Sequence, residues 1–252
     1  MSLIYLAPPI FLGIAFVFSM LGMGGSQLYI PILFWLGMDF KTQAILLGML
    51  LNVVNSSSAA FTYGRRKLID WKVALPFGIF MVIFAPLGTW VNIGLPTKPV
   101  ILIFAFFTAT AAILMLSGWK PKRGGLSMRG RFMLGVFAGS ILGFFAGLIG
   151  RGGGSFVVPL LYIAGLEPKI AAATSAMVVT LSGSSSFTSH IATAAQSDWS
   201  VWALCVVSVF FGSQTGSRLM AKRLKSKSIK LIFGTVLLGV ALLLIVRDVI
   251  LK

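Results

Sequence analysis

The sequence contains very little that could serve as a catalytic group or a metal ligand. Among its 252 residues it has five Asp and Glu, one His and one Cys. The single cysteine, Cys205, can form neither an internal disulfide nor a CxxC metal site, and we expect it to be a small packed apolar residue. Because the sequence contains no Ser/His/Asp constellation and no cluster of metal ligands, we predict no enzyme activity, no metal and no other cofactor.

Charged residues are also scarce, and apolar residues are abundant. Only 10% of residues are charged, 58% are hydrophobic and the mean hydropathy is +0.98, whereas a soluble domain has about 25% charged residues. Apolar stretches of about 17–22 residues, long enough to cross a bilayer, recur from end to end. The sequence therefore predicts a multi-pass membrane protein. Its N-terminal stretch has no basic region or cleavage site and is expected to be a membrane segment rather than a signal peptide.

The net charge of +16 could indicate nucleic-acid binding, but the positions of the charges favour another interpretation. Nearly all Lys and Arg lie in short loops between apolar runs, and no nucleic-acid-binding motif accompanies them. Such loops set membrane topology and contact anionic lipid headgroups. We therefore expect membrane lipids, and no nucleic acid, as partners of these loops.

Carboxylates are missing from the middle of the predicted membrane segments. The acidic residues, which fall in loops or at segment ends, are Asp39, Asp70, Glu167, Asp198 and Asp248. This placement argues against cation transport and against a proton relay built from Asp or Glu. No GxxxxGK[ST] motif is present, so the chain is not expected to hydrolyse ATP. Transport driven by the substrate gradient, or of a substrate that carries its own proton, stays open.

The two halves of the sequence are related. The stretch "LGMGGSQLYIPIL" at 21–33 matches "IGRGGGSFVVPLL" at 149–161, half a chain length further on. The same offset aligns "SSS" at 56–58 with 184–186 and "DW" at 70–71 with 198–199. We interpret residues 1–118 and 132–252 as two membrane repeats of one integral membrane domain, joined by the basic linker 119–131.

The charges of the loops indicate that the two repeats are inverted. The loop at 65–72 is basic whereas its counterpart at 193–200 contains no Lys or Arg, and the nearly neutral loop at 95–99 has a strongly basic counterpart at 223–227. Inverted repeats produce such opposite charges under the positive-inside rule. With the basic loops in the cytoplasm, both termini are expected on the extracytoplasmic side.

Each repeat is expected to contain five helical segments. These are 3–21, 26–37, 43–63, 73–94 and 98–118 in the first repeat, and 132–149, 154–165, 170–192, 200–219 and 229–247 in the second. The segment after each glycine-rich turn has about 12 residues, or about 18 Å of helix, which is too short to cross the membrane. The predicted fold is therefore all-α, with two inverted five-segment repeats that each contain a broken or re-entrant glycine-rich helix.

The two glycine-rich turns are the predicted centre of a substrate site. Glycine lets backbone N–H groups approach a ligand, and the helices that start near Ser26 and Ser155 add the positive ends of their dipoles. Arg151 adds a full positive charge to the second turn, so an anion is favoured. Close packing of glycines, and pairing of Arg151 with a backbone carbonyl, are the structural alternatives.

Polar side chains in later segments could complete this site. Asn52, Asn55 and Ser56 share one helix face, and Thr180 and Ser184 share a face in the second repeat, with Gly183 left open as a third member. These groups could form a hydrogen-bond cage around an oxyanion. Packing between helices is again the alternative. The predicted substrate-binding residues are Gly24, Gly25, Ser26, Gln27, Asn52, Asn55, Arg151, Gly152, Gly153, Gly154, Ser155, Thr180 and Ser184. The lone histidine, His190, is expected to be structural, and a role in a proton relay stays open.

The repeated motif G-x-G-G-[SG]-x-x-x-x-P-x-L, followed by a span with small polar residues, resembles the TauE/SafE sulfite and organosulfonate exporter family over about residues 10–247. The family's glycine motif falls on Gly22, Gly24, Gly25 and Pro31, and on Gly150, Gly152, Gly153, Gly154 and Pro159. Ser26 stands where the second repeat has Gly154, so the two turns need not contribute equally. The resemblance implies a bacterial inner-membrane carrier for sulfur-containing anions such as sulfite, thiosulfate or organosulfonates.

These observations predict a secondary transporter of small anions that works by alternating access at a site near the membrane midplane. A channel-like pore for small anions is the alternative, and a membrane scaffold or membrane enzyme is less consistent with two polar broken segments. Besides the anion and membrane lipids, a second copy of the chain stays open as a partner. The identity of the sulfur anion, the direction of transport and the coupling ion are left undecided.

Overall fold

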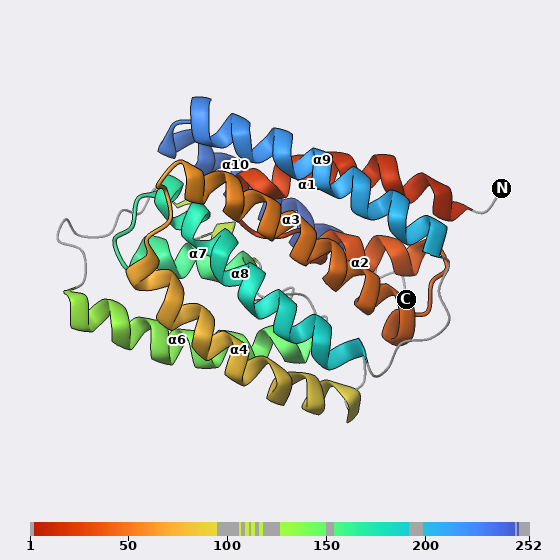
Figure 1. The fold of residues 1–252 in the computed structure, drawn as a ribbon, viewed down its shortest axis with the longest axis horizontal. Helices are drawn as coiled ribbons and strands as arrows, with labels where there is room; N and C mark the ends of the chain where they lie inside the picture. The colour runs from red at the N-terminus through yellow and green to blue at the C-terminus, as the bar shows by residue number, and fades with distance from the viewer. Residues whose placement is uncertain are drawn as a thin grey trace.

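The computed structural model describes residues 3–94, 127–149, 154–191 and 199–244, together with 106, 109, 110, 112, 113, 116, 117 and 246. Within these residues all regular structure is helical (Figure 1). The elements are η1 (Leu3–Leu6), α1 (Ala7–Leu21), α2 (Ser26–Trp35), η2 (Phe40–Ala44), α3 (Ile45–Arg65), α4 (Trp71–Gly94), α6 (Met128–Ile149), α7 (Gly154–Ile163), α8 (Pro168–His190), α9 (Trp199–Arg223) and α10 (Ser226–Leu244). The expected segment 98–118 and the linker 119–131 lie largely outside the described residues.

The described helices follow the segments expected from the sequence. α2 and α7 each contain 10 residues, or about 15 Å of helix, which is too short to cross a membrane. Five helices in the described part of the chain are long and apolar enough to cross one, namely Ile4–Leu21, Thr42–Arg65, Trp71–Val91, Arg129–Leu148 and Pro168–His190. The prediction of an all-α protein with several membrane-crossing helices is therefore confirmed.

α3 and α8 pack against each other in the middle of the bundle (Figure 1). α1 packs along α9 on one side and α4 packs along α6 on the other, while α9 also contacts α3 and α4 contacts α8. The short helices α2 and α7 pack against α3 and α8, respectively. Buried apolar side chains form two clusters, one that includes Phe77 and Phe233 and one that includes Phe11 and Tyr29. In the alignment of the two repeats, α1, α2, α3 and α4 correspond to α6, α7, α8 and α9. The α1–α9 pair therefore corresponds to α6–α4, the α3–α9 pair to α8–α4, and the α2–α3 pair to α7–α8.

Glycines bring the paired helices into backbone contact. On α6, one face carries Gly135, Gly139, Gly143 and Gly147, all turned toward α4. A Cβ atom at Gly147 would lie 1.9 Å from the carbonyl oxygen of Ala85. Small residues at such spacing allow helices to approach closely within a membrane. This glycine face was not predicted as a packing surface, although its glycines recur at every fourth position of the sequence.

Each of the two outer helix pairs, α4–α6 and α1–α9, contains an equivalent glycine contact. A Cβ atom at Gly88 of α4 would lie 1.9 Å from the carbonyl oxygen of Phe144 on α6, and one at Gly216 of α9 would lie 2.0 Å from that of Phe16 on α1. Gly88 aligns with Gly216 at the same sequence offset as the glycine motifs, and Phe16 aligns with Phe144. The α4–α6 and α1–α9 pairs therefore use equivalent positions for a close backbone approach.

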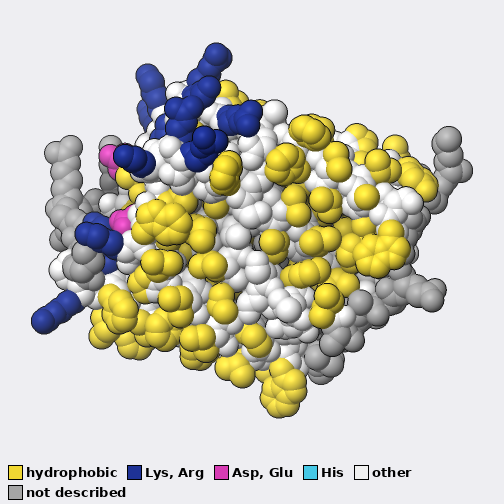
Figure 2. Space-filling view, viewed as in Figure 1, with side chains coloured by type: hydrophobic (Ala, Val, Ile, Leu, Met, Phe, Trp, Pro, Cys, Tyr) yellow, Lys and Arg dark blue, Asp and Glu magenta, His cyan; other side chains and the backbone are white. Residues whose placement is uncertain are grey.

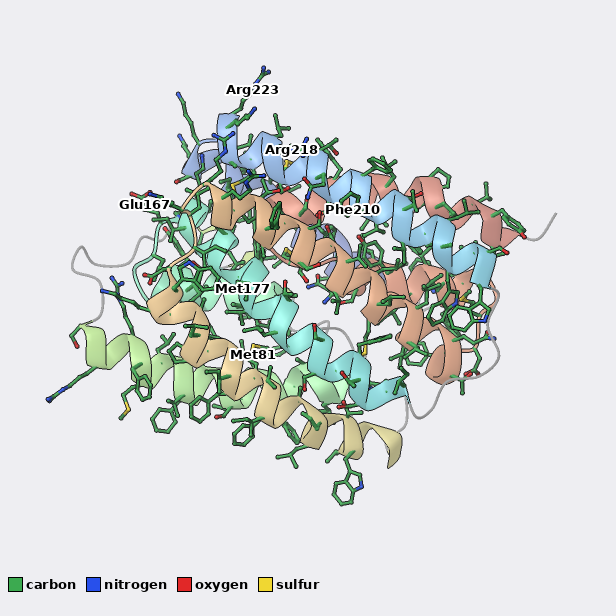
Figure 3. All side chains as sticks on the ribbon, viewed as in Figure 1. Met81, Glu167, Met177, Phe210, Arg218 and Arg223 are labelled. Atoms are coloured by element: carbon green, nitrogen blue, oxygen red, sulfur yellow. The ribbon has the colours of Figure 1, made fainter. Side chains whose placement is uncertain are left out.

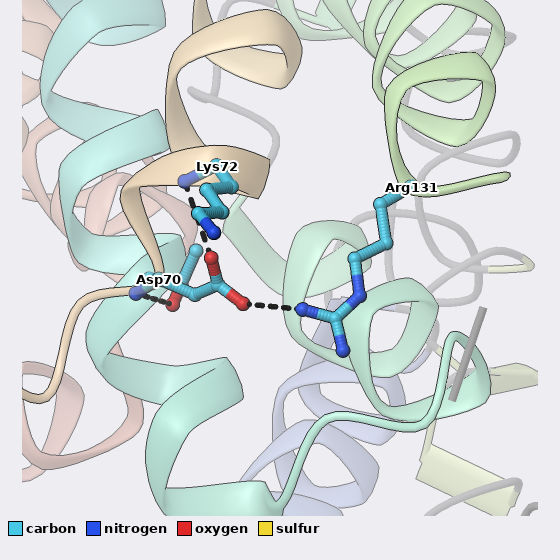
Figure 4. Close-up of polar contacts among 4 residues, drawn as sticks. Asp70, Lys72 and Arg131 are labelled. Carbon is cyan, nitrogen blue, oxygen red and sulfur yellow. Dashed lines mark hydrogen bonds and ion pairs between the residues drawn. The ribbon is translucent and has the colours of Figure 1, made fainter. Parts of the chain in front are cut away.

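The start of α4 is held by Asp70, which joins three helices (Figure 4). Its carboxylate accepts a hydrogen bond from the backbone N–H of Lys72 at 3.2 Å and pairs with the Arg131 guanidinium of α6 at 2.9 Å. The backbone N–H of Asp70 donates to the Thr174 hydroxyl of α8 at 3.0 Å. Asp70 is thus an N-cap residue and an ion-pair partner at once.

Basic side chains gather at one end of the molecule. Figure 2 shows most of the visible Lys and Arg there, where α3 and α9 end and α4, α6 and α10 begin. We call this the basic end; it comprises Arg65, Arg66, Lys67, Lys72, Arg129, Arg131, Arg218, Lys222, Arg223, Lys225, Lys227 and Lys230. Apolar side chains are spread over much of the rest of the visible face, as expected for a surface in contact with lipid.

Candidate functional site

The turn between α1 and α2 has a backbone conformation that glycine adopts most readily. Gly22, Gly24 and Gly25 have φ angles of +67°, +85° and +110°, in the left-handed region that other residues avoid. Space is limiting as well, because a Cβ atom at Gly24 would lie 1.9 Å from the Asn52 side-chain oxygen. The turn therefore lies directly against the asparagines of α3.

Side chains of α3 and α8 hold this turn in place. Asn52 Oδ1 accepts a hydrogen bond from the backbone N–H of Ser26 at 3.3 Å, and Asn55 Nδ2 donates to the carbonyl oxygen of Gly24. From α8, the Ser175 hydroxyl donates to the carbonyl oxygen of Gly22 at 2.8 Å. The predicted shared face of Asn52 and Asn55 thus contacts the first glycine turn.

Several buried polar atoms on α2 and α3, the helices that follow and face the turn, have no hydrogen-bond partner among the described residues. They are Asn52 Nδ2, Asn55 Oδ1, both amide atoms of Gln27 and the hydroxyl of Tyr29. All four side chains are at most 1% exposed. A buried polar group without a partner costs about 1–3 kcal/mol, and native structures normally satisfy it with water or a ligand. We call these four residues the amide cluster.

The second glycine segment approaches the first. Gly154 begins α7, and a Cβ atom on it would lie 2.3 Å from the carbonyl oxygen of Met23, within the first turn. Arg151, Gly152 and Gly153 lie outside the described residues, and the structure describes only the backbone of Ser155, in α7. The start of α7 therefore lies against the first turn. The residues that directly precede α7 in the chain, 151–153, belong to the second turn and are not described.

The predicted polar face of α8 lies elsewhere. The Thr180 hydroxyl donates to the carbonyl oxygen of Ala176 at 2.7 Å, and the Ser184 hydroxyl donates to that of Thr180 at 2.8 Å. Both hydroxyls are thus satisfied within their own helix, and Ser184 is exposed. The α8 position that meets the amide cluster is Gly183, where a Cβ atom would lie 3.0 Å from Asn52 Nδ2. The structure does not bring Thr180 and Ser184 together with Asn52 and Asn55.

Sequence reasoning missed three residues around the turn. Tyr29 belongs to the amide cluster, Ser175 bonds to Gly22, and the hydroxyl of Tyr63 donates to the carbonyl oxygen of Ser19 at 2.6 Å. Tyr29 lies one helical turn after Gly25, so its position beside the glycine motif was a signal. Ser175 corresponds to Leu47 in the first repeat, and the comparison of repeats therefore could not find it.

Long apolar helices packed around a buried polar cluster define a multi-pass membrane protein with an internal polar site. The chain belongs to the sulfite exporter TauE/SafE family, whose model matches residues 8–244. The resemblance based on the two glycine motifs is thereby confirmed, and the chain is a member of a family of membrane transporters.

Similar proteins from other organisms carry the same general description. A Bacillus subtilis protein named "Probable membrane transporter protein YunE" is 25% identical over 257 residues, covering 92% of this chain and 93% of the relative. A "Probable membrane transporter protein" of Xylella fastidiosa is 26% identical over 240 residues, covering 93% and 92%. A further relative, from Methanocaldococcus jannaschii, is 26% identical over 183 residues, covering 69% and 67%. No solved structure gives a significant match.

Proposed function

We propose that this protein is a secondary transporter of small sulfur-containing anions, such as sulfite, thiosulfate or organosulfonates. The observation that carries the proposal is the amide cluster, whose buried polar atoms lie on α2 and α3 next to a glycine turn and have no partner among the described residues. The family name adds the class of substrate, because the matching family is described as sulfite exporters.

The chemistry of the cluster suits an oxyanion. Asn52 Nδ2, Gln27 Nε2 and the Tyr29 hydroxyl can each donate a hydrogen bond, and the N-terminus of α2, which begins at Ser26, adds a favourable dipole. Hydrogen bonds to an anion are strong in a buried site of low dielectric. Neutral donors bind a small anion without presenting a competing carboxylate.

The second glycine turn would complete the site in this proposal. Gly154 lies against Met23 of the first turn, and residues 151–153 directly precede Gly154 in the chain. Arg151 would supply the positive charge, and Gly152, Gly153, Gly154 and Ser155 would supply backbone donors opposite Gly24, Gly25 and Ser26. Thr180 and Ser184, whose hydroxyls bond within α8 here, would contact the anion in another conformation of the carrier.

Alternating access is the proposed mechanism, with residues 1–118 and 132–252 as two inverted repeats around the site. Two observations support an internal two-fold relation: every major helix pair has a counterpart at the offset of the glycine motifs, and the contact of Gly88 with Phe144 is matched by that of Gly216 with Phe16. In inverted-repeat transporters, exchanging the conformations of the two halves moves the opening from one side to the other.

The proposed location is the bacterial inner membrane with the basic end in the cytoplasm. The concentration of Lys and Arg at one end (Figure 2) supports this orientation through the positive-inside rule. Both termini then lie on the extracytoplasmic side.

Ligand-dependent thermal stabilisation of the purified protein tests this proposal. The panel comprises sulfite, thiosulfate, sulfoacetate, taurine, sulfate, chloride and phosphate, and a ligand that binds the folded state raises the melting temperature. We expect selective stabilisation by a sulfur oxyanion or sulfonate, and its loss in Arg151→Ala. A panel without any stabilising sulfur anion would contradict the proposed substrate class. Single-channel conductance in planar bilayers would replace the carrier mechanism with an anion pore.

A further inference from the structure

A groove runs along the side of the molecule between α3 and α9. Its volume is about 670 Å³, and its lining includes Ser57, Ser58 and Phe61 of α3 and Phe210, Gln214 and Arg218 of α9. We call it the side groove. At the basic end it meets a second hollow of about 300 Å³ that shares Phe61, Gln214 and Arg218 and adds Arg65, Arg66 and Lys222.

The chemistry of the side groove changes along its length. Phe210, Phe211 and Phe61 are 45%, 58% and 63% exposed, so the part away from the basic end presents aromatic surface to the hydrocarbon. The floor is polar, because Gln214 Nε2 donates to the Ser58 hydroxyl at 2.8 Å and to its carbonyl oxygen at 3.2 Å. Figure 3 shows Phe210 near the middle of α9, with Arg218 closer to the basic end. Slightly more than two helical turns, or about 12 Å, separate the two residues along the helix.

The cationic part of the groove is not neutralised by the described acidic residues. Arg65, Arg66, Arg218 and Lys222 line the hollow at the basic end, and no acidic residue is among the described residues that line it. The ion pair found in the described part of the chain joins Arg131 to Asp70 and involves none of the four. The Arg65 guanidinium lies 5.6 Å from the centre of the Phe61 ring, which orients this cation at the junction of the aromatic and basic parts.

We propose that the side groove binds an anionic phospholipid. The phosphate would lie among Arg65, Arg66, Arg218 and Lys222, and an acyl chain would follow Phe61, Phe210 and Phe211 along α9. An amphipathic ligand fits this arrangement because the aromatic surface and the cations lie about 12 Å apart along one helix, at the level where headgroup and hydrocarbon meet. A free oxyanion would use the cations but would leave the aromatic surface without a partner.

Native mass spectrometry of the purified protein tests lipid binding directly. Phosphatidylglycerol and phosphatidylcholine are added at equal concentrations in detergent, and the bound fraction of each is measured. We expect phosphatidylglycerol to be retained preferentially. Each cation near a membrane surface contributes roughly a fivefold change in affinity for an anionic lipid. Arg218→Gln should thus weaken retention about fivefold and Arg65→Gln/Arg218→Gln about 25-fold.

Arg129→Gln is the matched control. Arg129 is an exposed arginine of the basic end, and it lines neither hollow. We expect its retention of phosphatidylglycerol to equal that of the unmodified protein. Equal losses in Arg129→Gln and Arg218→Gln would reduce the effect to general surface charge and overturn the site. Unchanged retention in the double variant would overturn it as well.

Inorganic phosphate separates a lipid from a soluble anion. It should fail to displace bound phosphatidylglycerol, because it cannot occupy the aromatic part of the groove. If inorganic phosphate displaces the lipid at millimolar concentration, the hollow is a soluble-anion site and the lipid proposal is wrong.

The substituted arginines are all exposed, so the variants are expected to fold. Elution of each variant as a single peak in gel filtration verifies this.

Discussion

At the scale of the residue, the amide cluster has a specific consequence for stability. The amide of Gln27 is fully buried and has no partner among the residues that the structure describes, so we expect it to destabilise the protein without ligand. Residues of this kind are retained where they contact a ligand, since function and stability then conflict.

Gln27→Leu should therefore raise the stability of the ligand-free protein while removing its response to the anion. Replacing an unsatisfied buried amide by an apolar group of similar size should stabilise by about 1–3 kcal/mol, or roughly 2–4 °C in melting temperature per kcal/mol for a chain of this length. Thermal unfolding with and without the stabilising anion measures both effects.

Thr89→Val is the control for this prediction. The Thr89 hydroxyl is also buried and has no partner in the described part of the chain, but it lies on α4 rather than on α2 or α3, which carry the amide cluster. We expect Thr89→Val to keep the full response to the anion. If Gln27→Leu responds to the anion as the unmodified protein does, Gln27 does not belong to the binding site.

At the scale of the element, the close packing of α4 and α6 depends on glycine. Gly147→Ala should destabilise the protein by at least about 1–3 kcal/mol, because the added methyl group would meet the carbonyl oxygen of Ala85 at 1.9 Å and the helices would have to separate. Gly239→Ala on α10, where no described residue lies within 4 Å, should instead stabilise by up to about 1 kcal/mol through helix propensity. Melting temperatures compare the two variants, and a Gly147→Ala protein as stable as Gly239→Ala would contradict this packing.

At the start of α4, substitutions can separate the contribution of Asp70 as a helix cap from its contribution as an ion-pair partner. Arg131→Ala removes the ion pair and leaves the cap of Asp70 in place. Because the pair is partly exposed (side chains 31% and 20%), we expect a loss below about 1 kcal/mol. Asp70→Asn should cost a similar amount, since the side-chain oxygen still accepts from Lys72. Asp70→Ala also removes the cap and should cost about 1 kcal/mol more. Equal stability of Asp70→Ala and Asp70→Asn, measured by thermal unfolding, would show that the cap contributes nothing.

Helix boundaries were the most predictable part of this fold. The expected segment 26–37 became Ser26–Trp35 and the expected 154–165 became Gly154–Ile163, since glycine and apolar length mark these ends in the sequence.

The rotation of a helix about its own axis was less predictable. Asn52 and Asn55 do meet the first turn, but α8 presents Gly183 there and leaves Ser184 exposed. The face that a central helix turns toward a neighbour depends on all of its neighbours together, and two repeats with different side chains need not rotate alike.

At the scale of the whole molecule, the basic end predicts the orientation in the membrane. In a Cys205→Ala background, Lys227→Cys should react with a membrane-impermeant maleimide only from the cytoplasmic side. Trp199→Cys, at the exposed start of α9 (75% exposed), should react only from the opposite side. Labelling of intact cells and of inverted vesicles measures this. Because Cys205 is buried and alanine is only slightly smaller, the background protein should still fold. Reaction of Lys227→Cys in intact cells would reverse the proposed topology.

The central position of α3 and α8 also bears on how the chain enters the membrane during synthesis. These helices have lower mean hydropathy (1.6 and 1.3) than the first span (2.1), and they are more buried. α3 ends at Arg65 and α8 begins at Pro168, so a ribosome that adds about 5–20 residues per second makes α8 roughly 5–20 s after α3. During that interval Asn52 and Asn55 cannot yet be enclosed by α8 and α9. We therefore expect nascent α3, held to the first glycine turn by Asn52 and Asn55, to stay beside the insertion machinery or a chaperone until the second half of the chain covers it.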